Sequence, residues 1–149
     1  MKISFYINKT DSSPSSLAIY NGLNKLVDSG KVTDANLFFN DVDFMPVQPK
    51  FGMFDGSNIW HYTGTLVATT LKNLNLANLA VNKFKLVYMY DRQQVDSTQL
   101  YGLLQSVGVP VITLTKEDQD QYYRLTGVRP VLFDSVEDIN LEKLEINHE

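Results

Sequence analysis

His61 is the side chain in this sequence best suited to moving a proton near neutral pH. It lies beside the only tryptophan, Trp60, in a polar and aromatic run at positions 58–65. One interpretation makes His61 a general base. The alternative is structural: Trp60 and Tyr62 fill the edge of the core, and His61 forms a hydrogen bond nearby. A single central histidine does not establish a Ser-His-Asp triad, because a triad is an arrangement in space.

Further candidates lie where strands are expected to end, because a ligand binds beyond the carboxyl ends of the strands in an open parallel sheet. Asp91 is predicted to be catalytic, either by orienting His61 or as an acceptor for a hydroxyl group. Gly64 is expected to let a ligand approach the backbone closely. The alternative for each acid or serine is local, since such residues commonly shape turns and cap helices. The predicted site has two facing walls, one of Asn8, Ser12 and Ser13 and the other of His61, Thr63, Gly64 and Asp91.

Other ligand classes leave weaker patterns in the sequence. Asp41, Asp43 and Asp55 could present carboxylates to a metal ion or a sugar, or could belong to a solvated turn. Two histidines far apart and the absence of cysteine predict no zinc site. The sequence contains neither a dinucleotide-binding G-x-G-x-x-G after its first strand nor a P-loop. The helix start at Ser12 and Ser13 could still hold a phosphate, with a simple N-cap as the alternative.

Alternating strands and helices must position these residues. Apolar, β-branched runs predict strands at residues 3–7, 35–40, 65–70, 84–90, 109–114 and 131–133. Residues 41–56 are expected to form a long loop with a short strand around Met53, followed by a helical turn at 57–62. Helices are predicted at 71–81 and after four start signals, Ser13-Pro14, Ser97, Thr115 and Ser135. This order predicts one Rossmann-like α/β domain over residues 1–149, with three layers, a mostly parallel sheet and helices on both faces.

Composition limits the classes of function. A chain of 149 residues suits one domain, and a net charge of −4 with scattered lysines disfavours direct nucleic-acid binding. The sequence has no signal peptide and no apolar stretch long enough for a membrane span, so a cytoplasmic location is the expectation. A homodimer is one expectation, through tyrosines predicted to be exposed: Tyr20, Tyr101, Tyr122 and Tyr123.

Several segments together resemble glycosyltransferase-like proteins of tailed bacterial phages. These are the runs at residues 38–41, 46–54 and 59–70, the strand Leu86-Val87-Tyr88-Met89-Tyr90-Asp91, and the later runs 109–113 and 123–130. The resemblance covers roughly residues 35–135. It implies similarity to the N-terminal, acceptor-side half of a two-domain Rossmann-type glycosyltransferase, acting in the host cytoplasm. Glu137 and Glu145 have the spacing of a donor-binding pair but no Gly-rich lead-in, and we interpret them as solvated charges.

Two functions follow from these observations. The first is a single-domain glycosyltransferase-like phage protein that acts with a partner on nucleotide-linked or DNA-linked sugars. A nucleotide-sugar is then the expected small-molecule ligand. The alternative is a non-enzymatic phage accessory or interaction protein on a Rossmann-like scaffold, because one architecture supports many functions. The sequence leaves open whether the chain is an enzyme.

Overall fold

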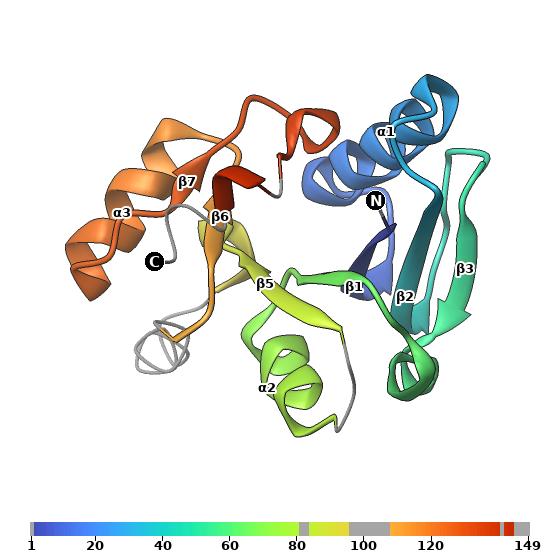
Figure 1. Cartoon of the computed structure of the whole chain (residues 1–149), viewed down its shortest axis with the longest axis horizontal. Coiled ribbons are helices and arrows are strands. Elements are labelled where there is room, and N and C mark those ends of the chain that lie inside the picture. Colours follow the sequence, from blue (N-terminus) through green and yellow to red (C-terminus); the bar gives the residue numbers. More distant parts are fainter. Residues whose placement is uncertain (1, 81–83, 96–107, 141, 145–149) are drawn as a thin grey trace.

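The computed structural model describes residues 2–80, 84–95, 108–140 and 142–144. Its centre is a sheet of seven parallel strands in the order β3-β2-β1-β4-β5-β6-β7. Figure 1 shows α1 and α2 on opposite sides of this sheet. The predicted Rossmann-like α/β architecture is confirmed. The strands are β1 (Lys2–Thr10), β2 (Asp34–Val42), β3 (Gly52–Asp55), β4 (Thr65–Ala68), β5 (Lys85–Met89), β6 (Val111–Thr113) and β7 (Val131–Leu132).

The helices alternate with the strands. They are α1 (Pro14–Ser29), α2 (Leu71–Leu79) and α3 (Lys116–Thr126), with short 3-10 turns η1 (Gly56–His61), η2 (Arg92–Gln94) and η4 (Val136–Asp138). The helix expected after Ser97 lies outside the described residues. Within the described residues, no helix is both long enough and apolar enough to cross a membrane.

Local signals explain the ends of α1. Ser13 is the N-cap, its hydroxyl accepts the Ser16 N–H, and Pro14 occupies the first helical position. Gly30 ends the helix with a φ of 71°, a left-handed conformation that glycine adopts without steric cost. The middle of the helix packs closely, because Gly22 has no side chain where η4 crosses over it. The predicted start of this helix is therefore confirmed.

The sheet has two apolar faces. One face packs on α1 and η4 through side chains of β1, β2, β4, β5 and β6, including Phe5, Leu37 and Val67. The other face packs on α2 and α3 and is rich in aromatic side chains, with Tyr90 lying 5.3 Å, ring centre to ring centre, from Tyr122. The chain passes from β2 to β3 through a loop rather than a helix, and that loop inserts Phe51 into the α1 face.

Two tyrosines expected at the surface are buried, so that prediction was wrong. Tyr20 and Tyr122 are both fully covered, whereas Tyr123 is exposed as expected. The Tyr20 hydroxyl is satisfied inside the fold by the backbone of Asp11, and the Tyr122 ring packs against Tyr90. A tyrosine can be buried fully when its hydroxyl finds a partner. Tyr101 lies outside the described residues.

The region after Ser135 also differs from the prediction. Ser135 makes no side-chain capping bond, and a short 3-10 turn, η4, follows it in place of the expected start of a helix. Three apolar residues of this region are nevertheless buried: Val136, Ile139 and Leu144.

Candidate functional site

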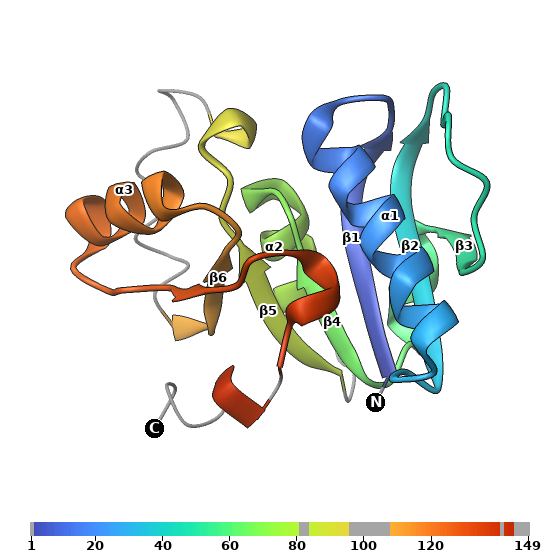
Figure 2. The ribbon, with the colours of Figure 1, turned by 90° about the horizontal axis from the view of Figure 1, so that it is seen from above.

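The strand order places a reversal point between β1 and β4. From β1 the chain moves outward to β2 and β3, then returns to the other side of β1 to form β4 and the strands beyond it. The connections after β1 and β4 therefore diverge, which opens a crevice at the carboxyl edge of the sheet. In Figure 2 the start of α1 and the η2 turn lie at the top, which is this carboxyl edge.

A cavity occupies this reversal point. It has a volume of about 120 Å³ and is formed by the ends of β1, β4 and β5 together with the first turn of α1. We call it the crevice. Nearly all of its polar lining consists of carboxylate, hydroxyl and amide groups: Asn8, Asp11, Ser15, Ser16, Thr69, Asp91 and Gln94. Such groups can donate and accept several hydrogen bonds over a small surface.

Asp91 connects the two sides of the crevice. It follows β5, and one carboxylate oxygen accepts a hydrogen bond from the Ser15 hydroxyl at the start of α1. The other oxygen accepts the Gln93 backbone N–H at 2.9 Å and thereby caps η2. Asp91 thus has both the predicted position at a strand end and the structural role proposed as its alternative.

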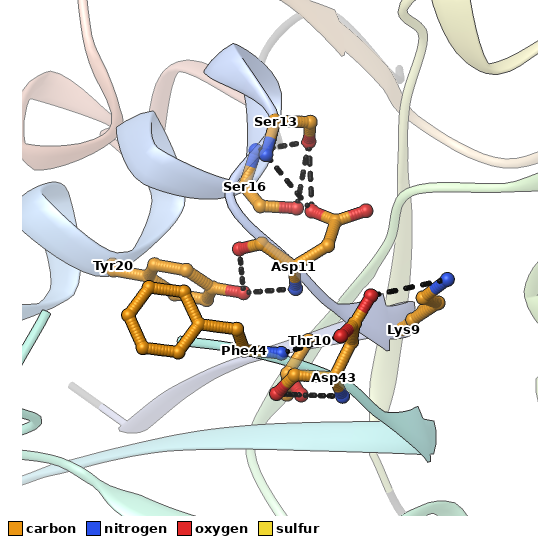
Figure 3. A network of polar contacts seen from close by, with 8 residues as sticks. All are labelled: Lys9, Thr10, Asp11, Ser13, Ser16, Tyr20, Asp43 and Phe44. Carbon is orange, nitrogen blue, oxygen red and sulfur yellow. Dashed lines mark hydrogen bonds and ion pairs between the residues drawn. The ribbon is translucent and has the colours of Figure 1, made fainter. Parts of the chain in front are cut away.

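Asp11 provides a second carboxylate at the start of α1. One of its oxygens accepts bonds from the Ser13 N–H at 3.2 Å and the Ser13 hydroxyl at 2.9 Å. Partial burial pushes the pKa of Asp11 upward, but hydrogen bonds from Ser16 and Ser13 outweigh this and lower it overall. Asp11 is therefore ionised at neutral pH. Figure 3 shows this carboxylate facing the first turn of α1.

These two acids determine the charge of the crevice. A helix N-terminus carries a partial positive charge that attracts anions. Here Asp11 and Asp91 already lie against that end of α1. Among the described residues that line the crevice, Lys9 is the one cation, and its ammonium group pairs with Asp43 at 3.4 Å. A phosphate would meet two carboxylates here, so the crevice suits an uncharged, hydroxyl-rich ligand better.

A second cavity adjoins the crevice and shares Ser15, Met89 and Asp91 with it. Its volume is about 250 Å³, and it extends to the first turn of α3. There the side chain of Asp118 lies 3.7 Å from the Arg92 guanidinium. Burial raises the pKa of Asp118, and neighbouring Asp91 adds to the rise, although the Thr115 hydroxyl and the Arg92 N–H bond to Asp118 and oppose it. This second cavity is acidic as well.

A buried amide network supports the crevice from the α2 face. The Asn40 amide donates to Asn73 at 2.8 Å and to Asn8 at 3.4 Å, while its carbonyl accepts the Tyr6 hydroxyl at 2.7 Å. Asn73 in turn donates to the backbone carbonyl of Tyr6 at 3.2 Å. Gly56 makes this network possible, because a Cβ there would lie 2.6 Å from the Asn40 carbonyl oxygen. The network holds Asn8 at the wall of the crevice.

The structure brings together only part of the predicted site. Asn8 and Asp91 line the crevice, and Ser13 lies one hydrogen bond away through Asp11, while Ser12 is exposed at its margin. The remaining predicted residues lie elsewhere. His61 ends η1 on the surface, and Thr63 and Gly64 precede β4 at the amino edge of the sheet. Of the second predicted wall, Asp91 therefore faces the first, and His61, Thr63 and Gly64 do not.

Gly64 has a structural reason for being glycine. Its φ is +129°, and a Cβ at this position would lie 2.8 Å from the Cβ of Lys2 and 2.6 Å from the Tyr62 hydroxyl. The close approach is made by the chain itself. Tyr62 is buried against Phe38, with ring centres 5.4 Å apart, whereas Trp60 is 49% exposed. The structural alternative had both Trp60 and Tyr62 at the edge of the core, and of these two only Tyr62 is buried there.

Sequence reasoning missed three polar residues of the crevice: Ser15, Ser16 and Gln94. Asp11 and Thr69 follow β1 and β4, so both were among the strand-end candidates. Ser15 and Ser16 lie in the first helical turn, where serine carries no distinctive pattern. Asp43 and Asp55, considered as ligands above, bind locally: Asp43 to Lys9 and the Phe44 N–H, and Asp55 to the Ser57 N–H.

The chain matches no protein-family model, and no curated protein or solved structure is significantly similar to it. The functional argument below therefore depends on the geometry of the crevice and on the chemistry of its lining.

Proposed function

We propose that the chain binds the hydroxyl-bearing sugar acceptor of a glycosyl transfer in the crevice. It would act as the acceptor-side domain of a glycosyltransferase-like phage protein, with the donor nucleotide-sugar bound mainly by a partner chain. The observation that carries this proposal is the pair of carboxylates, Asp11 and Asp91, at the start of α1. Their negative charges offset the partial positive charge of the helix N-terminus, which would otherwise attract phosphate. Their oxygens can also accept hydrogen bonds from hydroxyl groups.

Asp91 is the candidate base of this proposal. A sugar hydroxyl that replaces Ser15 as its hydrogen-bond partner would direct its proton at the carboxylate. In the transfer, Asp91 would take that proton as the hydroxyl oxygen bonds to the anomeric carbon of the donor. The bond from that carbon to the nucleotide phosphate breaks, and the phosphate leaves with the electron pair. His61 has no part in this proposal, because it lies on η1 away from the crevice.

The test is an NMR titration of the ¹⁵N-labelled chain with neutral methyl glycosides, inorganic phosphate, nucleotides and nucleotide-sugars. We expect methyl glycosides to shift the backbone amides of residues 8–16 and 91–94, and phosphate to leave them unchanged. Asp91→Asn should weaken glycoside binding roughly tenfold, the effect expected for a hydrogen bond to a charged group. Asp34→Asn, at the amino edge of β2, removes the same charge and should have no effect.

Three results would reject the proposal. They are the absence of glycoside-dependent shifts, shifts confined to the amino edge, and equal binding by the Asp91→Asn and Asp34→Asn variants. Tight phosphate or nucleotide binding at residues 13–16 would instead indicate that the helix end overcomes the two carboxylates.

A non-enzymatic interaction role is the second candidate. The observation in its favour is the exposure of two large apolar side chains on consecutive elements, Phe54 on β3 and Trp60 on η1. A second copy of the chain is the partner we would test first. Light scattering over a concentration series should show self-association that Trp60→Ser abolishes, and a monomer at every concentration would contradict this form of the candidate.

A further inference from the structure

The segment that follows β2 displays an aromatic ring to solvent. Phe44 is 71% exposed, and its neighbour in the extended chain, Val42, is 74% exposed. Single apolar residues at a surface are common, but a large aromatic ring this open to water is not. The position of Phe44 near the carboxyl edge of β1 and β2 makes its surroundings informative.

The backbone that carries this ring is held firmly. The Thr10 hydroxyl, which is buried, accepts the Asp43 N–H at 3.0 Å and donates to the Asp43 carbonyl at 3.3 Å. The Asp43 carboxylate accepts the Phe44 N–H at 2.8 Å and pairs with Lys9 at 3.4 Å. Four interactions therefore fix the backbone of Asp43 and Phe44, and this fixed backbone determines where the Phe44 ring meets solvent.

The same polar network reaches the crevice. Lys9 and Asp11 line the crevice. The residue between them, Thr10, is hydrogen-bonded to the backbone of Asp43. In Figure 3 the Phe44 ring points away from the Lys9–Asp43 pair, toward the side of Asp11 on which Tyr20 lies. Hydrogen bonds and an ion pair thus connect the backbone that carries the ring to residues 9–11, two of which line the crevice.

We infer that Phe44 is a platform for a second sugar ring, so that the ligand of the crevice is an oligosaccharide or an extended glycoside. This inference rests on the proposed function. A pyranose has one face of C–H groups, which can cover an aromatic ring, and a rim of hydroxyls, which can donate to Asp11 and Asp43. The lowered pKa values of these two acids, due mainly to their hydrogen bonds, keep both of them ionised as acceptors.

The surroundings of the ring favour a sugar over other occupants. A stable protein partner needs a continuous interface near 1,000 Å² or more, and one ring with one valine supplies little of its apolar centre. A nucleobase could stack on the ring, but its phosphates would then lie among Asp11, Asp43 and Asp91. An uncharged ligand with an apolar face satisfies both the ring and the carboxylates.

The test compares monosaccharides with disaccharides on the intact chain. The methyl glycosides of glucose, galactose and mannose and the corresponding disaccharides are titrated by NMR into wild type, Phe44→Ala, Phe44→Trp and Val42→Ala. We expect disaccharides to bind wild type roughly twofold to tenfold more tightly than methyl glycosides, the range of one aromatic stacking contact. Phe44→Ala should remove this ratio and leave methyl glycoside binding unchanged, while Phe44→Trp and Val42→Ala keep the ratio.

The outcomes separate this inference from the proposed function. If Asp91→Asn weakens methyl glycoside binding but Phe44→Ala leaves the disaccharide ratio unchanged, the platform is rejected and the crevice stands. If wild type binds no glycoside, both are rejected. Amide spectra and thermal unfolding should match wild type in the Phe44 variants, because the ring is exposed, and Phe44→Trp tests the platform even if the alanine variant unfolds.

Discussion

The hydroxyl of Tyr20 satisfies both backbone groups of Asp11. It accepts the Asp11 N–H and donates to the Asp11 carbonyl, each at 2.9 Å. Asp11 lies between the end of β1 and the N-cap of α1, where neither the sheet nor the helix provides partners for its backbone. A tyrosine in the second turn of the helix thus completes the turn that leads into that helix, and it fixes the position of the Asp11 carboxylate at the crevice.

We therefore expect Tyr20→Phe to lower the free energy of unfolding by about 1–3 kcal/mol, because two backbone groups lose their partner in a largely buried place. Chemical denaturation measures the change. Tyr123→Phe on α3 removes the same atom from an exposed side chain and should stay close to wild type. Equal stability of the two variants would mean that water replaces the Tyr20 hydroxyl without cost.

Gly22→Ala should destabilise the chain by about 1–3 kcal/mol, the usual cost of overpacking. An added Cβ would collide with the Val136 side chain, whose Cγ1 atom would lie 2.6 Å away. This effect opposes the gain in helix propensity that alanine normally brings. The melting temperature measures the net change, and Asn21→Ala, at an exposed position on the same helix, is the control. An increase in stability would show that η4 moves away easily.

Asn73→Ala should cost about 1–3 kcal/mol and also alter the crevice. The side chain is fully buried, and its loss removes two hydrogen bonds, one from the Asn40 amide and one to the Tyr6 carbonyl, each worth about 0.5–1.5 kcal/mol. Asn8 still accepts from the Asn40 amide, and Thr69 still donates to the Tyr6 carbonyl. Since Asn40 also donates to Asn8, the side-chain NH₂ resonances of Asn8 should move. Asn75→Ala, one exposed position along α2, should change neither the stability nor those resonances. Unchanged Asn8 resonances would show that the amide network does not determine the position of Asn8 in the crevice.

Asp118→Asn should stabilise the chain at neutral pH. Burial raises the pKa of Asp118, so the folded chain holds this proton at a pH where the unfolded chain has released it. Ionised Asp118 therefore opposes folding near neutrality, and its protonation at lower pH removes that effect. The melting temperature of the variant should exceed that of wild type at about pH 7, and the gap should close toward about pH 3. Glu117→Gln, in the same helical turn, should show no comparable gap.

Much of the fold follows from short-range patterns. Ser13-Pro14 and Thr115 start helices, and Gly30 and Gly127 end them, because each acts on backbone groups within four residues. The alternation of strands and helices then indicates a parallel sheet. The burial of Tyr20 was not predictable in this way, because it depends on a partner that only the folded turn from β1 to α1 supplies.

The candidate site was predicted only in part for a related reason. Asn8 and Asp91 follow strands, and parallel strands bring their carboxyl ends to one edge. Gly64 precedes a strand, so the same rule places it at the opposite edge of the sheet from Asp91. The Asp11 carboxylate belongs to the site because it bonds to the start of α1, and the Ser15 hydroxyl because it bonds to Asp91. The spacing of residues in the sequence does not indicate either contact.

The central position of β1 also bears on how the chain is made. The unit β1-α1-β2 lies within residues 2–42 and is synthesised before the other strands, so every later strand adds to an existing edge strand. β3 follows soon after and becomes the edge strand on one side of the sheet. On the other side the edge strand is β4, then β5, then β6, until the two-residue β7 is added. A nascent chain that stalls between β4 and β7 would display an unpaired strand to other chains, and we expect aggregation to be greatest for truncations in that interval.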